Sequence, residues 1–176
     1  MIYRERSEEK RRVFIEKTNK LSKDCIVYVD ESGMDQFLYR EHARALRGQK
    51  VSGIISGRKY KRISIVAAQC DGKVLAPLEY SGTTDSVLFE YWFEHLLLPE
   101  LSVGHVIVMD NAAFHRKEVL RRLAGEFGCS LMFLPAYSPD LNPIEHFWAW
   151  IKRKLKDFLP AADSFDSALS DLFQLV

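Results

Sequence analysis

The sequence predicts an α/β domain built on a mixed five-stranded sheet with flanking helices. Three observations support this class. Two early apolar runs form a hairpin, later runs alternate with amphipathic helices, and acidic residues stand where β-rich runs end. A hairpin that leads into β–α units gives a sheet that is antiparallel at first and parallel later.

The size and charge of the chain indicate one domain and no obvious partner. Its 176 residues are 47% hydrophobic, which suffices for one substantial core. Lys and Arg number 25 and Asp and Glu number 24, so a nucleic-acid surface must come from local clustering. Cys25, Cys70 and Cys129 show no Cys-x-x-Cys spacing, which predicts free thiols in a reducing compartment. With no membrane-spanning run and no signal peptide, we expect a cytoplasmic protein without a membrane partner.

The first elements are a polar helix and a buried strand. Residues 7–22 form the helix, with Ser7 as its cap, inside an N-terminal arm or linker at residues 1–24. Residues 25–30 form the first strand, which Glu31-Ser32-Gly33 ends, so that Asp30 closes it.

A glycine-containing basic segment follows. Between positions 40 and 62 the only acid is Glu41, against eight basic residues: Arg40, Arg44, Arg47, Lys50, Arg58, Lys59, Lys61 and Arg62. Such a run is usually a solvated face, but its single sign also suits a loop that follows a phosphate backbone. We therefore expect Arg58, Lys59, Lys61 and Arg62 to contact DNA.

The hairpin is predicted at residues 63–70 and 73–80, joined by Asp71-Gly72. Pro77 marks the second strand as an edge strand or a bulge. A helix should follow over residues 84–98, capped by Thr84 or Asp85. Its buried stripe is predicted to comprise Val87, Leu88, Tyr91, Trp92 and His95.

The next elements carry a second acid. We predict a strand at residues 106–110 that ends in Asp110, a helix at residues 117–127, and a strand at residues 129–134. His115 follows Asp110 closely, and it either positions substrate DNA or is an unrelated surface histidine.

The last strong helix spans residues 143–159 and carries a third acid, Glu145. Its buried stripe comprises Ile144, Phe147, Trp148, Ile151, Leu155 and Phe158. Asn142 suits the N-cap, so Glu145 has a purely structural alternative as the acid of a capping box. Lys152 and Lys156 share a flank with Glu145 and could contact phosphates. Residues 161–176 form a C-terminal helical tail.

Asp30, Asp110 and Glu145 together fit a two-metal phosphoryl-transfer site. Mg²⁺ prefers oxygen ligands, and two ions need a bridging carboxylate and further acids. No histidine or cysteine pair has the spacing of a zinc site. Among competing acids, Glu31 should point to the opposite face of its strand and Asp140 fits a turn.

Three segments resemble the acidic motifs of DDE transposases of the mariner-like superfamily, which includes bacterial insertion-sequence elements. They are Val-Asp-Glu-Ser-Gly at 29–33, Met-Asp-Asn-Ala-Ala-Phe-His at 109–115, and Tyr-Ser-Pro-Asp-Leu-Asn-Pro-Ile-Glu-His-Phe-Trp at 137–148. The third is long and specific. Thirty-four residues separate Asp110 from Glu145, as in one branch of the superfamily.

The resemblance implies a ribonuclease H-like catalytic domain at residues 25–160. It implies two Mg²⁺ ions, for which Mn²⁺ substitutes, held by Asp30, Asp110 and Glu145. The implied reactions are cleavage at transposon ends and transfer of the 3′-OH into target DNA, by a homodimer associated with the nucleoid.

Members of that superfamily usually carry N-terminal helix-turn-helix domains, whereas one helix precedes the first strand here. We therefore expect a split or frameshifted reading frame with an upstream helix-turn-helix polypeptide, a decayed copy, or an excised catalytic domain. The alternative functions are a ribonuclease H-like nuclease without strand transfer and an inactive DNA-binding or assembly module.

Overall fold

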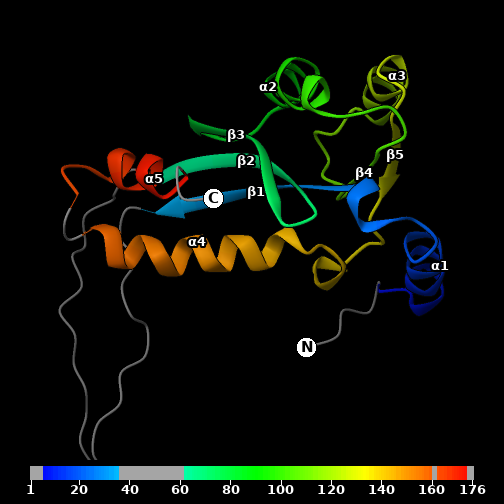
Figure 1. The fold of residues 1–176 in the computed structure, drawn as a ribbon, viewed down its shortest axis with the longest axis horizontal. Helices are drawn as coiled ribbons and strands as arrows, with labels where there is room; N and C mark the ends of the chain where they lie inside the picture. Colours follow the sequence, from blue (N-terminus) through cyan, green and yellow to red (C-terminus); the bar gives the residue numbers. More distant parts are fainter. Residues whose placement is uncertain (1–5, 36–61, 160–161, 174–176) are drawn as a thin grey trace, which may run out of the picture.

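A single mixed sheet forms the centre of the protein (Figure 1). The structure is a computed structural model that describes residues 6–35, 62–159 and 162–173. Within these residues the five strands lie in the order β3-β2-β1-β4-β5. Their bounds are β1 Ile26–Asp35, β2 Arg62–Cys70, β3 Lys73–Ser81, β4 Val106–Met109 and β5 Ser130–Phe133.

Helices cover both faces of this sheet. Their bounds are α1 Glu8–Thr18, α2 Ser86–Trp92, α3 Lys117–Glu126, α4 Ile144–Phe158 and α5 Phe165–Phe173. Short helical turns are η1 Lys23–Cys25, η2 Phe93–Leu97, η3 Leu98–Glu100 and η4 Pro139–Leu141. Figure 1 shows α2 and α3 on one side of the sheet and α4 on the other. Among the described residues, no helix has both the length and the apolarity that crossing a bilayer requires.

The β2–β3 hairpin has the predicted turn and the predicted irregular edge. Asp71 and Gly72 both have positive φ, 46° and 80°, as a two-residue hairpin turn requires. β3 is an edge strand, and the β2–β3 register shifts between Val66 and Ala68. The prediction drawn from Pro77 is therefore confirmed.

β1 is longer than predicted. The strand continues five residues beyond Asp30 to Asp35, because β2 pairs with it from Val27↔Cys70 to Asp35↔Arg62. Gly33 belongs to this extension, and a Cβ placed there would lie 2.2 Å from the Arg62 guanidinium. The prediction that Glu31-Ser32-Gly33 ends the strand was therefore wrong. These residues continue β1 because β2 supplies their backbone hydrogen bonds.

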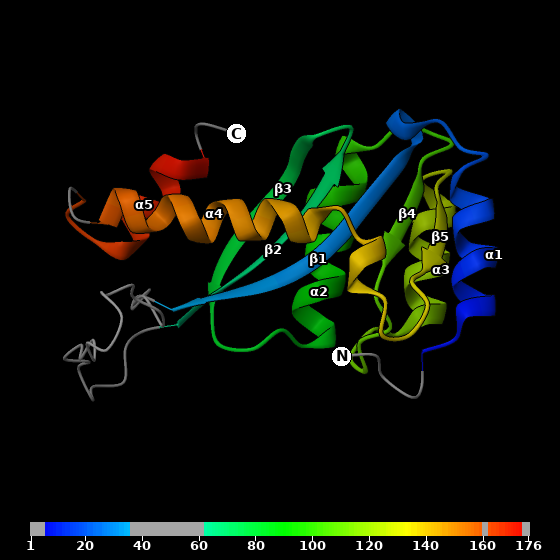
Figure 2. The ribbon, with the colours of Figure 1, turned by 90° about the horizontal axis from the view of Figure 1, so that it is seen from below.

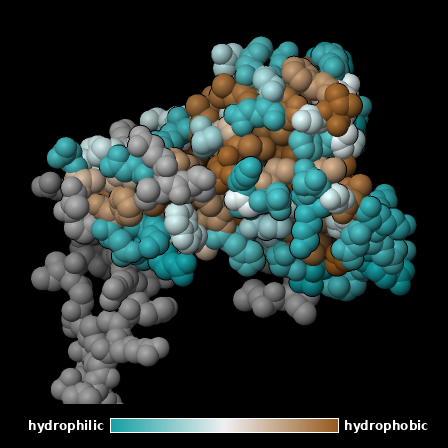
Figure 3. Space-filling model, viewed as in Figure 1, coloured by the Kyte–Doolittle hydropathy of each residue, from teal (hydrophilic) through white to brown (hydrophobic). Residues whose placement is uncertain are grey.

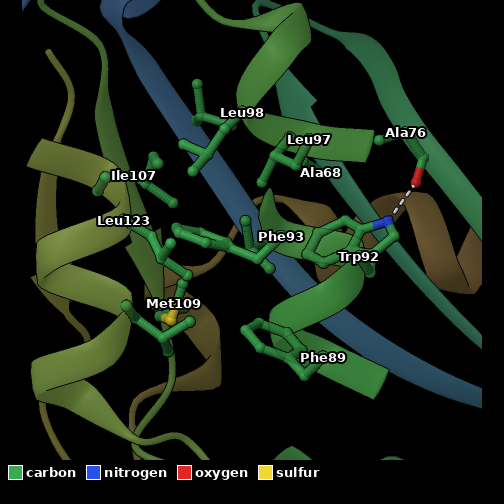
Figure 4. Close-up of a cluster of buried hydrophobic side chains, with 14 of the residues drawn as sticks. Ala68, Ala76, Phe89, Trp92, Phe93, Leu97, Leu98, Ile107, Met109 and Leu123 are labelled. Carbon is green, nitrogen blue, oxygen red and sulfur yellow. Dashed lines mark hydrogen bonds between the residues drawn. The ribbon is translucent and has the colours of Figure 1, made fainter. Parts of the chain in front are cut away.

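One core cluster lies between the sheet and the α2–η2–α3 layer (Figure 4). Phe89, Trp92, Phe93 and Leu97 are at most 1% exposed, and Trp92 Nε1 donates to the Ala76 carbonyl over 2.6 Å. Asp85 caps α2 by accepting from the Leu88 N–H, as one of the two predicted caps.

The predicted stripe of the 84–98 helix was largely wrong. Val87 and Tyr91 are 69% and 59% exposed, and His95 is also exposed. Trp92 is the one predicted member that is fully buried. After Trp92 the helix changes to π-helical spacing in η2, so a constant 3.6-residue period cannot follow the buried face.

The opposite face is covered by α4, against which α5 packs. The α4 residues that are buried are Ile144, Phe147, Trp148, Ile151 and Leu155, all of them predicted. Full burial of such side chains contributes about 1.5–3 kcal/mol each before entropy is counted. This apolar face, rather than helix propensity, fixes how α4 lies under β1 and β2.

The parallel half of the sheet brings two acids together. β1 and β4 pair in parallel with Tyr28 opposite Val108, and β4 pairs in parallel with β5. Two residues further along the first register stand Asp30 and Asp110. The pairing of β1 with β4 therefore puts these two acids at the same edge of the sheet.

Candidate active site

The three acids named from the sequence line one open pocket. Asp30, Asp110 and Glu145 surround a volume of about 400 Å³ together with the loop that follows β5. Strand β1 supplies Asp30, the turn after β4 supplies Asp110, and α4 supplies Glu145. The pocket is thus built by elements that are far apart in the chain.

Asp30 is the most enclosed of the three. Its Oδ2 accepts a hydrogen bond from Trp148 Nε1 over 3.0 Å, and Trp148 is itself 2% exposed. Burial, reinforced by the negative charges of Glu145 and Glu31, raises the pKa of Asp30 to about 7. The dependence on Glu145 shows that these two carboxylates are electrostatic neighbours.

Asp110 follows β4 and starts a turn. Its Oδ1 accepts from the backbone N–H of Ala112 over 2.9 Å, which fixes the carboxylate relative to its own loop. The side chain is 50% exposed. One face of the Asp110 carboxylate is therefore available to the pocket.

Glu145 is not a capping-box residue. Asn142 is buried and turns its Nδ2 toward the Val29 carbonyl at 3.4 Å, while its backbone N–H donates to Pro139. No hydrogen bond joins the Glu145 carboxylate to the described residues, and the side chain is exposed. The structural alternative for Glu145, and the prediction of an Asn142 side-chain cap, were therefore wrong.

His115 lies behind the pocket, between two acids. Its Nδ1 is 3.4 Å from Asp110 Oδ1, and its Nε2 is 3.4 Å from Glu31 Oε1. Phe89 and Phe114 enclose the ring at centroid distances of 4.3 and 4.4 Å. The side chain is 1% exposed, so His115 is neither a surface histidine nor placed to contact DNA.

Glu31 takes part in this arrangement from the opposite face of β1. The sequence predicted that orientation but not the contact with His115. The side chain is only 18% exposed because it packs beside His115. Glu31, His115 and Asp110 therefore form one chain of polar contacts.

The donors of the pocket suit a hard divalent cation. They are carboxylate oxygens, and the raised pKa of Asp30 comes first from burial and then from repulsion by Glu145 and Glu31, both of which a bound cation would offset. Within the described ranges, no three His, Cys, Asp or Glu side chains are already close enough to hold an ion. Metal binding would therefore need a rotation of side chains, for which the exposed Glu145 has room.

An ion pair holds the loop before α4. Arg11 of α1 donates from Nη1 and Nη2 to the two carboxylate oxygens of Asp140, over 2.9 and 2.6 Å. The Arg11 side chain is 8% exposed, whereas Asp140 is 54% exposed. Asp140 therefore has the structural role that its turn position indicated, although the sequence did not indicate its partner.

Asn111 joins the ends of two neighbouring strands. Its Nδ2 donates to the Leu134 carbonyl over 2.6 Å, and its Oδ1 accepts from Lys117 Nζ over 2.7 Å. These two bonds give Asn111 a structural role.

The structure describes only some of the residues that are predicted to contact DNA. Lys156 is exposed and Lys152 is half-buried on α4. Arg62 begins β2 with its guanidinium beside Gly33. Arg58, Lys59 and Lys61 lie outside the described residues, so their predicted role stays a prediction.

The chain is similar to a known protein family and to individual proteins. The model of a family described as DDE superfamily endonuclease matches residues 25–166. The transposable element Tcb1 transposase of Caenorhabditis briggsae is 33% identical over 79 residues, covering 43% of this chain and 29% of that protein. The uncharacterized protein y4pE/y4sA of Sinorhizobium fredii is 28% identical over 106 residues, covering 58% and 64%. The chain spans less than two thirds of either relative.

Solved structures show the same fold. The Mos1 transposase paired-end complex with the left transposon end has a TM-score of 0.72 at 16% identity, covering 99% of this chain and 55% of that one. The Mos1 transposase catalytic domain with raltegravir and Mg has a TM-score of 0.66 at 16% identity, covering 99% and 84%. The five-stranded mixed sheet with flanking helices is therefore the predicted ribonuclease H-like fold.

Proposed function

The chain belongs to the DDE superfamily endonucleases, and from this membership we propose that it is a transposase catalytic domain of the mariner-like type. Its proposed reactions are cleavage of DNA at transposon ends and transfer of the freed 3′-OH into target DNA. The supporting observation is the shared pocket of Asp30, Asp110 and Glu145, supplied by β1, the turn after β4 and α4.

In this proposal the three carboxylates hold two divalent ions, Mg²⁺ or Mn²⁺. Such ions, when bound, activate the attacking oxygen and stabilise the leaving oxygen of the phosphodiester. Solved Mos1 structures described with Mg and with Mn support a divalent requirement here.

The side chains of this protein have separate tasks in the proposed mechanism. Asp30 stands on β1, and Asp110 stands in the turn directly after β4, where the Ala112 N–H holds its carboxylate; these two acids fix the position of the reacting phosphate. Glu145 has the freer side chain and completes the set from α4. Trp148 donates to one oxygen of Asp30 and so fixes the orientation of this carboxylate at the pocket.

A test compares three proteins on pre-cut element ends with target DNA and Mn²⁺. Asp110→Asn and Glu145→Gln keep side-chain size but remove a charged ligand, so we expect both to lose cleavage and joining by about 10³-fold or more. Asp163→Asn is the matched control, because Asp163 is exposed and lies outside the pocket. Undiminished joining by both site variants would refute the assignment.

Two alternatives predict other outcomes of the same assay. A nuclease without strand transfer would hydrolyse DNA or RNA and give no joined product. An inactive DNA-binding or assembly module would bind DNA with no calorimetric signal for Mn²⁺. The open pocket with three acids favours an active enzyme over an inactive module, and the similarity to transposases favours strand transfer over hydrolysis alone.

The proposed partners are transposon ends and target DNA, bound by a homodimer associated with the nucleoid in the cytoplasm. Mos1 complexes with transposon ends support the choice of DNA. We propose residues 25–160 as the catalytic unit, with residues 1–24 and 161–176 as an arm and a tail. An upstream helix-turn-helix polypeptide would supply recognition of the element's ends.

A further inference from the structure

A second hollow adjoins the acidic pocket and shares part of its wall. It encloses about 320 Å³, and both hollows are lined by Asn111, Leu134, Pro135 and Ala136. The residues that follow β5 therefore belong to the walls of both hollows, and the two adjoining hollows are together called a groove. The three acids line its first end, and its second end lies between α1 and β5.

Helix α1 forms a basic wall at the second end. Lys10, Val13 and Lys17 line the hollow, at positions three and four residues apart that share one helix face. Both lysines are exposed and form no ion pair within the described part of the chain. Phe14 and Arg11 hold the helix in place, since both are buried beneath it. Figure 3 shows a hydrophilic surface in the region that α1 occupies in Figure 1.

Further cations stand on the other side of β5. Lys117 Nζ lies 4.9 Å from the Phe133 ring centroid and donates to Asn111, which lines both hollows. Arg121 also lies over this ring, 5.4 Å from its centroid, although Glu118 neutralises part of its charge. Figure 1 shows β5 between α1 and α3, and Figure 2 shows α1 beside β5. Lysines therefore approach the end of β5 from both sides.

We propose that this groove, named here the α1–β5 groove, binds the phosphates of the DNA strand that flank the phosphate at the acids. The inference rests on the proposed function, which puts a phosphodiester in the acidic pocket. A polyanion that continues from this pocket meets the lysines of α1 directly. Lysine contacts to phosphates supply sequence-independent affinity and strong salt dependence.

The β5 edge offers a competing use, which is strand pairing with a second protein chain. β5 is only four residues long, and its end at Leu134 already bonds to Met109 and Asn111. Short edges flanked by lysines are typical of strands that avoid such pairing. These features favour a nucleic-acid strand over a protein strand.

The test measures binding of a fluorescein-labelled DNA duplex without divalent ions, so that no catalysis is needed. Lys10→Gln/Lys17→Gln is compared with the native protein and with Lys20→Gln. Lys20 is an exposed lysine just beyond α1 that does not line the groove. Loss of two phosphate contacts should weaken binding several-fold and reduce the slope of log K against log salt by about 1.8. Thermal unfolding checks that the double variant remains folded.

A second measurement locates the contact. Single phosphates around the cleavage position are replaced by uncharged methylphosphonates, and cleavage is followed with Mn²⁺. At one or more flanking positions the replacement should slow the native protein and have little further effect on the double variant. If the effects of the phosphate replacement and of the double substitution are additive at every position, the proposal that the groove binds flanking phosphates is wrong.

The outcomes separate this inference from the proposed function. If native and double-variant proteins bind with equal slopes while cleavage and joining persist, the groove is wrong and the transposase proposal stands. If binding weakens as expected but no DNA is cut or joined, the groove stands as a DNA-binding site and the transposase proposal fails. A change in sedimentation of the double variant with unchanged DNA binding would identify a protein-pairing edge and overturn the groove.

Discussion

Trp148 donates its indole N–H to Asp30 Oδ2 over 3.0 Å, and this bond joins the helix of Glu145 to the strand of Asp30. Trp148 lies one helical turn after Glu145 on α4. The relative placement of two acids therefore depends on one buried side chain. Hydrogen bonds that orient metal-binding carboxylates commonly change metal affinity or activity by about 10–100-fold.

Replacing Trp148 by Phe should lower the cleavage rate by about 10-fold or more and raise the Mn²⁺ concentration required. Phe keeps an aromatic ring in the core but leaves a small cavity, so thermal unfolding is measured alongside to separate lost stability from loss of the N–H donor. Rate measured against Mn²⁺ concentration checks this result. Trp150→Phe is the matched control, since Trp150 stacks on Phe147 and contacts neither Asp30 nor the pocket. Equal effects of both variants would contradict a role for the indole donor.

The raised pKa of Asp30 should make the free energy of unfolding decrease as pH rises. The folded-state pKa of about 7 lies above the ordinary value of 3.8, so between them the folded protein binds more protons than the unfolded chain. The contribution of Asp30 is complete below the lower pKa, declines through the interval and is lost above the higher pKa. Unfolding followed in EDTA between about pH 5 and pH 8 should show the decline, and Asp30→Asn should reduce it. Parallel pH profiles for the two proteins would be inconsistent with the raised pKa.

Breaking the Arg11–Asp140 ion pair should loosen the loop that leads into α4. Asp140→Asn leaves the buried guanidinium with a weaker partner, and we expect a loss of about 1 kcal/mol because Asp140 is largely exposed to solvent. Arg11 lowers the pKa of Asp140, so this stabilisation is present above the ordinary carboxyl pKa and disappears as pH falls through the folded-state value. Urea unfolding at neutral and acidic pH measures both effects. Glu8→Gln, which alters a second and more distant acid near Arg11, should change stability by less.

His115→Phe should lower the cleavage rate by about 10-fold or more and leave DNA affinity unchanged. The ring can still pack on Phe89, but it no longer contacts Asp110 and Glu31. Separate measurements of kcat and of DNA binding distinguish this positioning role from a DNA contact. His95→Phe is the control. His95 is exposed in η2, and its replacement should change neither kcat nor DNA affinity. Weaker DNA binding at an unchanged rate would restore the DNA-contact hypothesis.

Local pattern identified most elements of this protein but not their exact extent or orientation. The Asp71-Gly72 turn, the Asp85 cap and the buried face of α4 follow from short-range chemistry. The second half of β1 does not, because its hydrogen bonds come from β2. Likewise α2 has two apolar stripes, and only the sheet decides that Phe89 rather than Tyr91 points inward.

The sequence by itself selected the three acids that are proposed as metal ligands, since each stands in a motif near a strand or helix end. It also limited the metal to one that prefers oxygen ligands. Only the tertiary structure decided which groups support those acids: Trp148 beneath Asp30, His115 between Asp110 and Glu31, and Arg11 on Asp140. These contacts join residues up to 129 positions apart. Spacing along a chain records which residues share an element, whereas such pairs meet only when separate elements pack on one sheet.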